Sequence, residues 1–292
     1  MWISLTIFAA FMQTFRNALQ SKMSANVSST GTTLARFIFA GPIVVLYMLF
    51  LYIGLGYEFI LPSAKMLPYA ATTAVFQIMA TVLMVKLFQQ QNYAVGAGLA
   101  KSEALAAAIL GFFFFGSQLS LLGALGVFLG FIAVFIMSIK GKSGRPSAKT
   151  VLLGVSCGTS FAIGSLMVRE ASINSGLDFP LSAAWTLLIV ITMQVISLCI
   201  FLKFKEPKTV PTLFKNWKKT MMVSLTSALG SIGWFSAMAL MDVAYVKTLG
   251  QIEVLFTIIL AKVAMSKKTS TTDYIGLALI GISSVMVMMP VH

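Results

Sequence analysis

Residues 99–110 read Leu-Ala-Lys-Ser-Glu-Ala-Leu-Ala-Ala-Ala-Ile-Leu, and residues 249–260 read Leu-Gly-Gln-Ile-Glu-Val-Leu-Phe-Thr-Ile-Ile-Leu. Aligned without a gap at an offset of 150 positions, the two stretches bring Glu103 onto Glu253 among matching leucines and isoleucines. Apolar matches are common in a chain of this composition. A charge inside an apolar run is rare, because burying it in a membrane is energetically unfavourable. The repeated glutamate therefore predicts an internal duplication.

The duplication extends over both halves of the chain. Further identical pairs at the same offset are Ala94 with Ala244, Ser120 with Ser270, and Gly126 with Gly276. An offset of 153 positions brings Arg16 onto Arg169. We therefore predict two repeated units, residues 1–140 and residues 141–292.

The composition is that of a membrane protein. Of the 292 residues, 58% are hydrophobic and 10% are charged, whereas a soluble domain has roughly 45–50% apolar and about 25% charged residues. A membrane-spanning helix needs about 20 mostly apolar residues. We count ten such runs, at residues 3–20, 33–54, 66–88, 93–115, 121–139, 150–172, 180–203, 219–241, 244–265 and 272–289. The predicted fold class is an all-α membrane protein with ten transmembrane helices.

The number of spans per unit has a topological consequence. Five spans are an odd number, so the second unit must lie upside down in the membrane relative to the first. Inverted repeats of this kind are found in many secondary transporters, which bind their substrate near the midplane between the repeats. The sequence therefore predicts a transporter built from two inverted five-helix repeats.

The two matched glutamates are the first candidate binding residues. Glu103 and Glu253 lie near the middle of the fourth and ninth predicted spans, and Lys101 and Gln251 precede them by two positions. On a continuous helix two positions correspond to about 200°, so Lys101 is expected to find a partner other than Glu103. The glutamates either line a central pathway, where they bind an amine or a proton, or each holds a helix pair together through a buried hydrogen bond.

Other polar residues within the spans are further candidates. Arg16 and Arg169 are suited to binding a carboxylate or phosphate with two parallel hydrogen bonds, although an arginine near a span end also reaches the membrane surface. The remaining candidates are Lys247 for the pathway, and Gln77, Trp234 and Tyr245 for polar or stacking contacts with a ligand. Amide and aromatic side chains also pack helices together, so that alternative stays open for the last three.

Motifs for catalysis and metal binding are missing from the sequence. It has no HExxH, GxSxG or P-loop motif, one histidine at position 292, and two cysteines within apolar runs. We therefore expect no enzyme activity, no cofactor and no metal site. The net charge of +13 comes mainly from loop lysines, a pattern typical of membrane orientation and lipid headgroup contact rather than of nucleic-acid binding.

The basic loops also predict an orientation. The loops after the fifth, seventh and ninth predicted spans carry most of the lysines, and these three loops share the side opposite both termini. Loops rich in lysine and arginine remain in the cytoplasm. The charge distribution therefore predicts that both termini lie outside.

The chain resembles the drug/metabolite transporter superfamily, specifically its ten-span EamA-type branch. The resemblance covers almost the full length and lies in the five-plus-five duplication and in the similar ends of the two halves. Residues 108–120 lead to Gly126 and a glycine-rich fifth span, and residues 257–270 lead to Gly276 and the tenth span. Arg36, which opens the second span, also resembles the family pattern.

The resemblance implies an inner-membrane carrier, often an exporter of amino acids or other small metabolites, with a cavity between inverted repeats and cytoplasmic termini. The last point conflicts with the charge distribution. The chain also departs from many members, which carry a glycine–acid pair where it has Gly116-Ser117 and Ser266-Lys267, and a proline near the positions of Glu103 and Glu253.

Three functions are compatible with these observations. The leading hypothesis is a monomeric secondary transporter that exports a small polar metabolite, an amino acid or related zwitterion, by alternating access, with proton coupling left open. The second is a proton-coupled exporter of lipophilic cations. The third is a flippase or membrane enzyme that acts on a lipid-linked anion through the basic loops.

Overall fold

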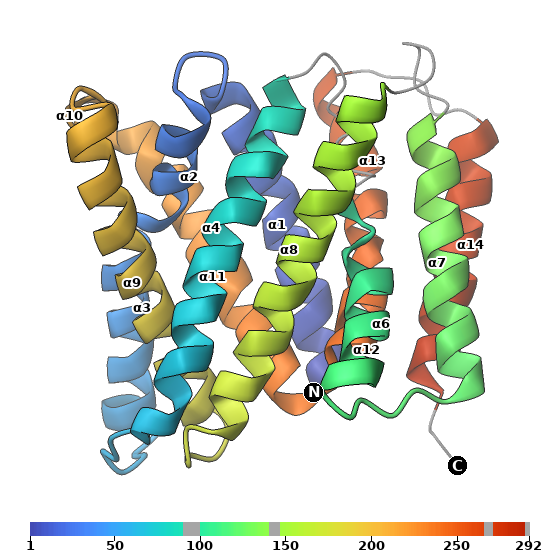
Figure 1. Ribbon diagram of the computed structural model, residues 1–292, viewed down its shortest axis with the longest axis horizontal. Coiled ribbons are helices and arrows are strands. Elements are labelled where there is room, and N and C mark those ends of the chain that lie inside the picture. The colour runs from blue at the N-terminus through green and yellow to red at the C-terminus, as the bar shows by residue number, and fades with distance from the viewer. Residues whose placement is uncertain (90–99, 140–146, 266–270, 290–292) are drawn as a thin grey trace.

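The computed structural model describes residues 1–89, 100–139, 147–265 and 271–289, and the regular structure in these ranges is helical (Figure 1). The first half contains α1 (Trp2–Met23), α2 (Ser29–Phe37), α3 (Ala40–Leu49), the π-helix η1 (Phe50–Gly54), the 3₁₀ turn η2 (Ala64–Met66), α4 (Leu67–Gln89), α6 (Glu103–Phe114) and α7 (Leu121–Ile139). The second half contains α8 (Ala148–Ile173), α9 (Leu181–Lys205), α10 (Thr209–Lys215), α11 (Trp217–Leu240), α12 (Val243–Leu249), the 3₁₀ turn η3 (Gly250–Ile252), α13 (Glu253–Met265) and α14 (Thr271–Met288).

Six helical segments of the described chain are long and apolar enough to cross a membrane. They are Ser29–Gly54, Ala64–Gln89, Ala148–Ile173, Leu181–Lys205, Trp217–Leu240 and Val243–Leu260, and three shorter apolar helices are Glu103–Phe114, Leu121–Ile136 and Ile275–Met288. Part of the fourth predicted span, residues 93–99, lies outside the described residues. The protein is therefore a multi-pass membrane protein, helical throughout its described regular structure, in which six described segments meet the length and composition of a span where the sequence predicts ten.

The first predicted span forms a helix, α1, but it is not among the six apolar spans. The reason is a stripe of polar residues at helical spacing, Gln13, Arg16, Asn17 and Gln20. Three of these side chains are buried, and Gln13 is half-buried. The polar stripe of α1 thus faces the protein interior, which is the only direction in which these groups find partners at membrane depth.

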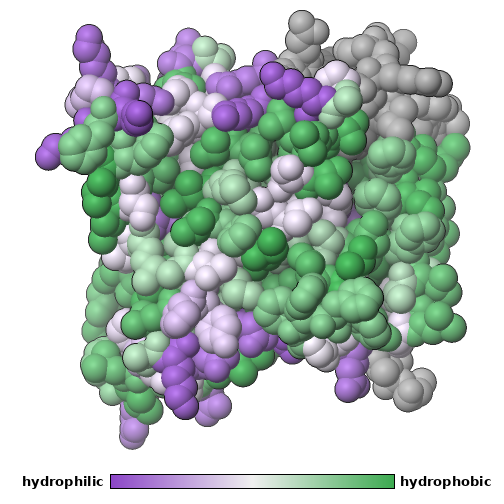
Figure 2. Space-filling model, viewed as in Figure 1, coloured by the Kyte–Doolittle hydropathy of each residue, from purple (hydrophilic) through white to green (hydrophobic). Residues whose placement is uncertain are grey.

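The helices pack in related pairs. The longest contacts run between α4 and α8, between α1 and α11, and between α7 and α14. In addition α6 lies against α8, and α12, η3 and α13 lie against α1. Each of these contacts joins a helix of the first half of the chain to one of the second half. The face of the molecule in Figure 2 is mostly hydrophobic over a broad central band, with hydrophilic residues gathered toward its two ends. Such a band is the surface that a lipid bilayer covers.

Both termini of the helical bundle lie at one end of the molecule. The start of α1 and the end of α14 are at the bottom of Figure 1, whereas α10 is at the top. The lysines that flank α10, among them Lys205, Lys208 and Lys218, are exposed. The lysine-rich corner formed by α9, α10 and α11 therefore lies opposite the termini, as the orientation argument assumes.

Each of the two matched glutamates is the first residue of a helix. Glu103 is the first residue of α6 and follows a turn at residues 101–102. Glu253 is the first residue of α13, which follows the 3₁₀ turn Gly250–Ile252 at the end of α12. The amino end of a helix carries a partial positive charge that stabilises a carboxylate, so each glutamate occupies an electrostatically favourable position at the start of its helix.

Close packing of α8 against the turn at residues 101–102, just before α6, depends on Gly158. A Cβ atom at this position would clash with Ser102 Oγ and lie 2.9 Å from the backbone nitrogen of Glu103. We predict that Gly158→Ala lowers the free energy of unfolding by about 1–3 kcal/mol, because overpacking forces the neighbouring backbone to move. Gly281→Ala on α14 is the matched control, since a Cβ there meets nothing within 4 Å. Equal stability of the two variants in a detergent unfolding titration would contradict the prediction.

Candidate functional site

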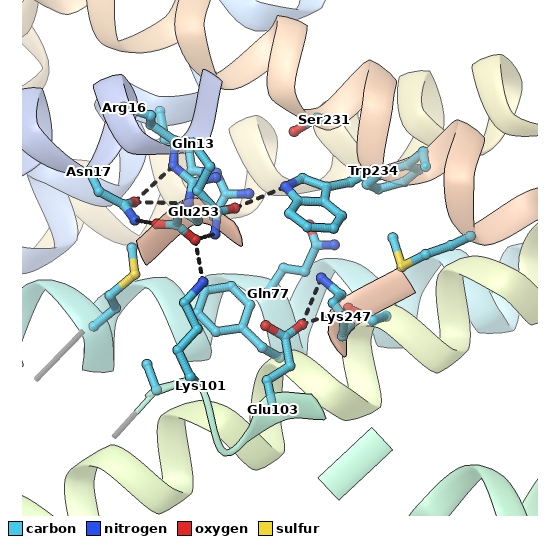
Figure 3. A pocket seen from close by; sticks show the side chains of 17 residues that line it. Gln13, Arg16, Asn17, Gln77, Lys101, Glu103, Ser231, Trp234, Lys247 and Glu253 are labelled. Carbon is cyan, nitrogen blue, oxygen red and sulfur yellow. Dashed lines mark hydrogen bonds and ion pairs between the residues drawn. The ribbon is translucent and has the colours of Figure 1, made fainter. Parts of the chain in front are cut away.

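A small, strongly charged cavity lies where the two halves of the chain meet (Figure 3). Its volume is about 50 Å³, enough for a few water molecules but smaller than a metabolite. Seven predicted site residues line it: Arg16, Gln77, Lys101, Glu103, Trp234, Lys247 and Glu253. The other lining residues are Gln13, Asn17, Arg36, Met84, Ala100, Phe161, Ser165, Ser231, Phe235 and Met238.

Glu253 is held by donors from three side chains. Lys101 Nζ forms an ion pair with Glu253 Oε2. Gln13 Nε2 donates to the same oxygen at 2.6 Å, and Asn17 Nδ2 donates to Oε1 at 2.7 Å. With only 4% of Glu253 exposed, these contacts and the amino end of α13 compensate for the loss of solvent around the carboxylate.

Glu103 has a corresponding set of partners. Lys247 Nζ lies 2.7 Å from Glu103 Oε1, and Ser165 Oγ donates to the same oxygen at 3.1 Å. The ammonium of Lys247 also lies 4.4 Å from the centre of the Trp234 ring, which is the geometry of a cation–π interaction. Trp234 Nε1 in turn donates to Gln13 Oε1 at 2.9 Å, so the surroundings of the two glutamates are connected.

Both ion pairs join one half of the chain to the other. Lys101 of the first half pairs with Glu253 of the second, and Lys247 of the second half pairs with Glu103 of the first. Lys101 lies in the turn before α6, and both it and Glu103 line the cavity. They do not pair with each other. The two halves are therefore linked across the cavity by two largely buried charge interactions.

Two buried arginines complete the charged lining. Arg16 Nε and Nη2 donate to Asn17 Oδ1 at 3.3 and 3.0 Å. Arg36 donates from Nε to Ser227 Oγ at 3.1 Å and from Nη1 to Thr81 Oγ1 at 2.8 Å. Arg16 is 2% exposed and Arg36 is 5% exposed. The partners of Arg36 are thus neutral hydroxyl groups.

Three predicted site residues lie outside this cavity. Arg169 Nη2 pairs with Asp242 Oδ1 at 3.1 Å, and Nη1 donates to the Met238 carbonyl at 3.1 Å. Tyr245 packs on Gly123 of α7, and its hydroxyl accepts from the Ser120 backbone N–H at 3.1 Å. Gln251 is fully buried beside Gly130 of α7. In this structure these three side chains contribute to contacts between helices.

Gln13, Asn17, Arg36 and Ser165 are site residues that the sequence prediction did not include. The polar stripe of the first predicted span is a signal that identifies Gln13 and Asn17, because they share a helix face with Arg16. Ser165 carries no such signal, since one serine in an apolar helix commonly bonds its own backbone. Arg36 was assigned to a span end, where arginine often reaches the surface.

Residues 148–289 match the EamA-like transporter family. This half of the chain is an EamA-like transporter domain. The match covers just under half of the chain, and the family is a branch of the drug/metabolite transporter superfamily, whose members are membrane transporters. The matched residues lie within the second of the two predicted units.

Two further comparisons bear on the chain. A search of curated proteins returned no match. A solved structure, titled only as the crystal structure of a protein, covers 98% of this chain and 96% of its own, with a TM-score of 0.69 and 14% identity. At this identity the likeness concerns the fold alone. It shows that the whole chain, including the half without a family match, has the architecture of an experimentally known protein.

Proposed function

We propose that this EamA-like protein is a secondary transporter that moves a small polar metabolite, an amino acid or a related zwitterion, out of the cell across the inner membrane by alternating access. The observation that carries the proposal is the buried charged cavity between the two halves. Intramembrane charges of this kind mark substrate or ion pathways. The enclosing helices all come from one chain, which supports a monomer as the transporting unit.

We further propose that the chain contains ten spans arranged as two inverted repeats. The helix contacts support this arrangement. If each helix is replaced by its counterpart in the other half, every one of the three most extensive helix pairs becomes another pair that is also in contact, or the same pair. The pair α1 and α11 corresponds to α8 and α4, and the pair α7 and α14 corresponds to itself. The helix starts at Glu103 and Glu253 lie at equivalent positions as well.

The ion pairs between the halves suggest how the cavity opens. Rocking one half against the other must lengthen the contacts between Lys101 and Glu253 and between Lys247 and Glu103. Separating a buried ion pair leaves uncompensated charges, which is unfavourable by roughly 3–5 kcal/mol. A bound substrate group, entering water or a proton on the carboxylate provides the replacement. Opening is thereby coupled to occupancy of the cavity.

The test is a reconstitution of the purified full-length protein. Thermal unfolding is measured against a metabolite panel, and each stabilising compound is then tested for counterflow in proteoliposomes. A ligand at about 100 times its dissociation constant stabilises the native state by about 2.7 kcal/mol, which is measurable. We expect at least one small polar metabolite to stabilise the protein and to exchange. If only lipid phosphates or lipophilic cations do so, the metabolite proposal is wrong.

A further inference from the structure

The charges that line the cavity do not balance. Among the described residues that line the cavity, four cationic side chains, Arg16, Arg36, Lys101 and Lys247, face two carboxylates, Glu103 and Glu253. Each carboxylate is already engaged by a lysine. The lining therefore carries an excess of positive charge, in a volume where few water molecules are available to screen it.

Arg36 shows where the excess is concentrated. The two hydrogen bonds of its guanidinium go to the hydroxyl groups of Ser227 and Thr81. Within the described part of the chain, no carboxylate lies within ion-pair distance of Arg36. A guanidinium has five N–H donors in a planar fork that matches a carboxylate. Arg36 is 5% exposed and also lies 5.0 Å from the centre of the Phe37 ring, a cation–π contact that offsets part of its charge. An anion would supply the direct ion pair that Arg36 lacks.

Binding of an amine in the same cavity is electrostatically less favourable than binding of an anion. To bind Glu103 or Glu253, a substrate ammonium must either add its positive charge beside Lys247 or Lys101 or displace that lysine. The displaced lysine would then lack its counter-charge in a buried site. An anion needs no such displacement, because it approaches groups that are already in excess. The electrostatics of the cavity therefore distinguish between substrates of opposite charge.

We infer that the transported solute is a small organic acid with a net negative charge, an acidic amino acid included, and that Arg36 binds its carboxylate. This inference rests on the proposed transport function, and within the small polar metabolites it favours anionic solutes over neutral zwitterions. Arg16 lines the same cavity and adds to the positive potential there. The solute enters an opened state, because the closed cavity of about 50 Å³ is too small for it.

The experiment uses four solutes with the same five-carbon skeleton: glutarate, glutamate, glutamine and the diamine cadaverine. Thermal stabilisation and proteoliposome exchange are measured for the wild type and for Arg36→Gln, Arg36→Lys and Lys65→Gln. Lys65 is an exposed cation remote from the cavity lining, so Lys65→Gln is the matched charge control. We expect the two acids to bind, with affinity lowered at least tenfold in Arg36→Gln, reduced less in Arg36→Lys and unchanged in Lys65→Gln.

The outcomes separate this inference from the function on which it rests. Binding and exchange of glutamine or cadaverine in preference to the acids would overturn the anionic class and leave the transporter intact. Acid binding of equal affinity in wild type, Arg36→Gln and Arg36→Lys would overturn the role of Arg36. The lack of any binding or exchange by all four solutes would count against both proposals. If Arg36→Gln does not fold, Arg36→Lys decides alone, because equal acid affinity in that folded variant contradicts binding by the guanidinium fork.

Discussion

Glu253→Gln is expected to abolish substrate exchange while the protein still folds. Glutamine keeps the shape of the side chain and one of its oxygens, so Gln13 or Asn17 can still donate to it. The ion pair with Lys101 disappears, and with it the charge contact that must break and re-form as the two halves rock. We expect counterflow to fall at least 100-fold, which corresponds to about 2.7 kcal/mol of lost stabilisation in the transport cycle.

The measurement is counterflow in proteoliposomes at equal protein content, with unfolding in detergent followed in parallel. Glu58→Gln is the matched control, because Glu58 is an exposed carboxylate outside the cavity lining, and it should retain full exchange. Glu103→Gln should also lose exchange, since Glu103 takes the equivalent place opposite Lys247. Exchange by Glu253→Gln at the wild-type rate would refute the role given to this glutamate.

Features that depend on local sequence were predictable. Hydrophobic runs determine where the helices lie, and most of the described helices coincide with predicted spans. The repeated charge in residues 99–110 and 249–260 pointed to positions that now lie in one cavity. These inferences need only the lengths of the apolar runs and the energetic cost of burying a charge. Lys101 and Glu103 do have separate partners, but Lys101 lies in a turn before α6, so the angle between two positions on a continuous helix is not the reason.

Features that depend on contacts between distant helices were not predictable from one sequence. Gln251 occupies the repeat position of Lys101, yet it lies beside Gly130 instead of in the cavity. Arg169 matches Arg16, yet it pairs with Asp242. Under the proposed repeat, matched residues of the two halves have different neighbours. A matched residue therefore keeps its place on the helix without keeping its partner, and partner identity requires the packing of helices from both halves.

Lys101→Met should be among the most destabilising single changes in the chain. Methionine approximates the length of the lysine stem but leaves Glu253 buried without a counter-charge, because the ion pair is lost. Removing one partner of a buried pair is unfavourable by roughly 3–5 kcal/mol. We expect about 3 kcal/mol here, measured by detergent unfolding titration, since Gln13 and Asn17 still donate to the carboxylate. The exposed Lys65→Met should change stability by less than about 0.5 kcal/mol.

The double variant Lys101→Met/Glu253→Gln tests whether this loss comes from the unpaired charge. Glutamine removes the negative charge that methionine leaves uncompensated, so the double variant should regain about 2 kcal/mol relative to Lys101→Met alone. A coupling of this size is expected for residues in direct contact, whereas independent sites give additive effects. Additive losses would mean that Lys101 stabilises the fold through packing alone. The expected result, combined with lost transport, would instead mean that the same charge contact closes the cavity and must open for a solute to pass.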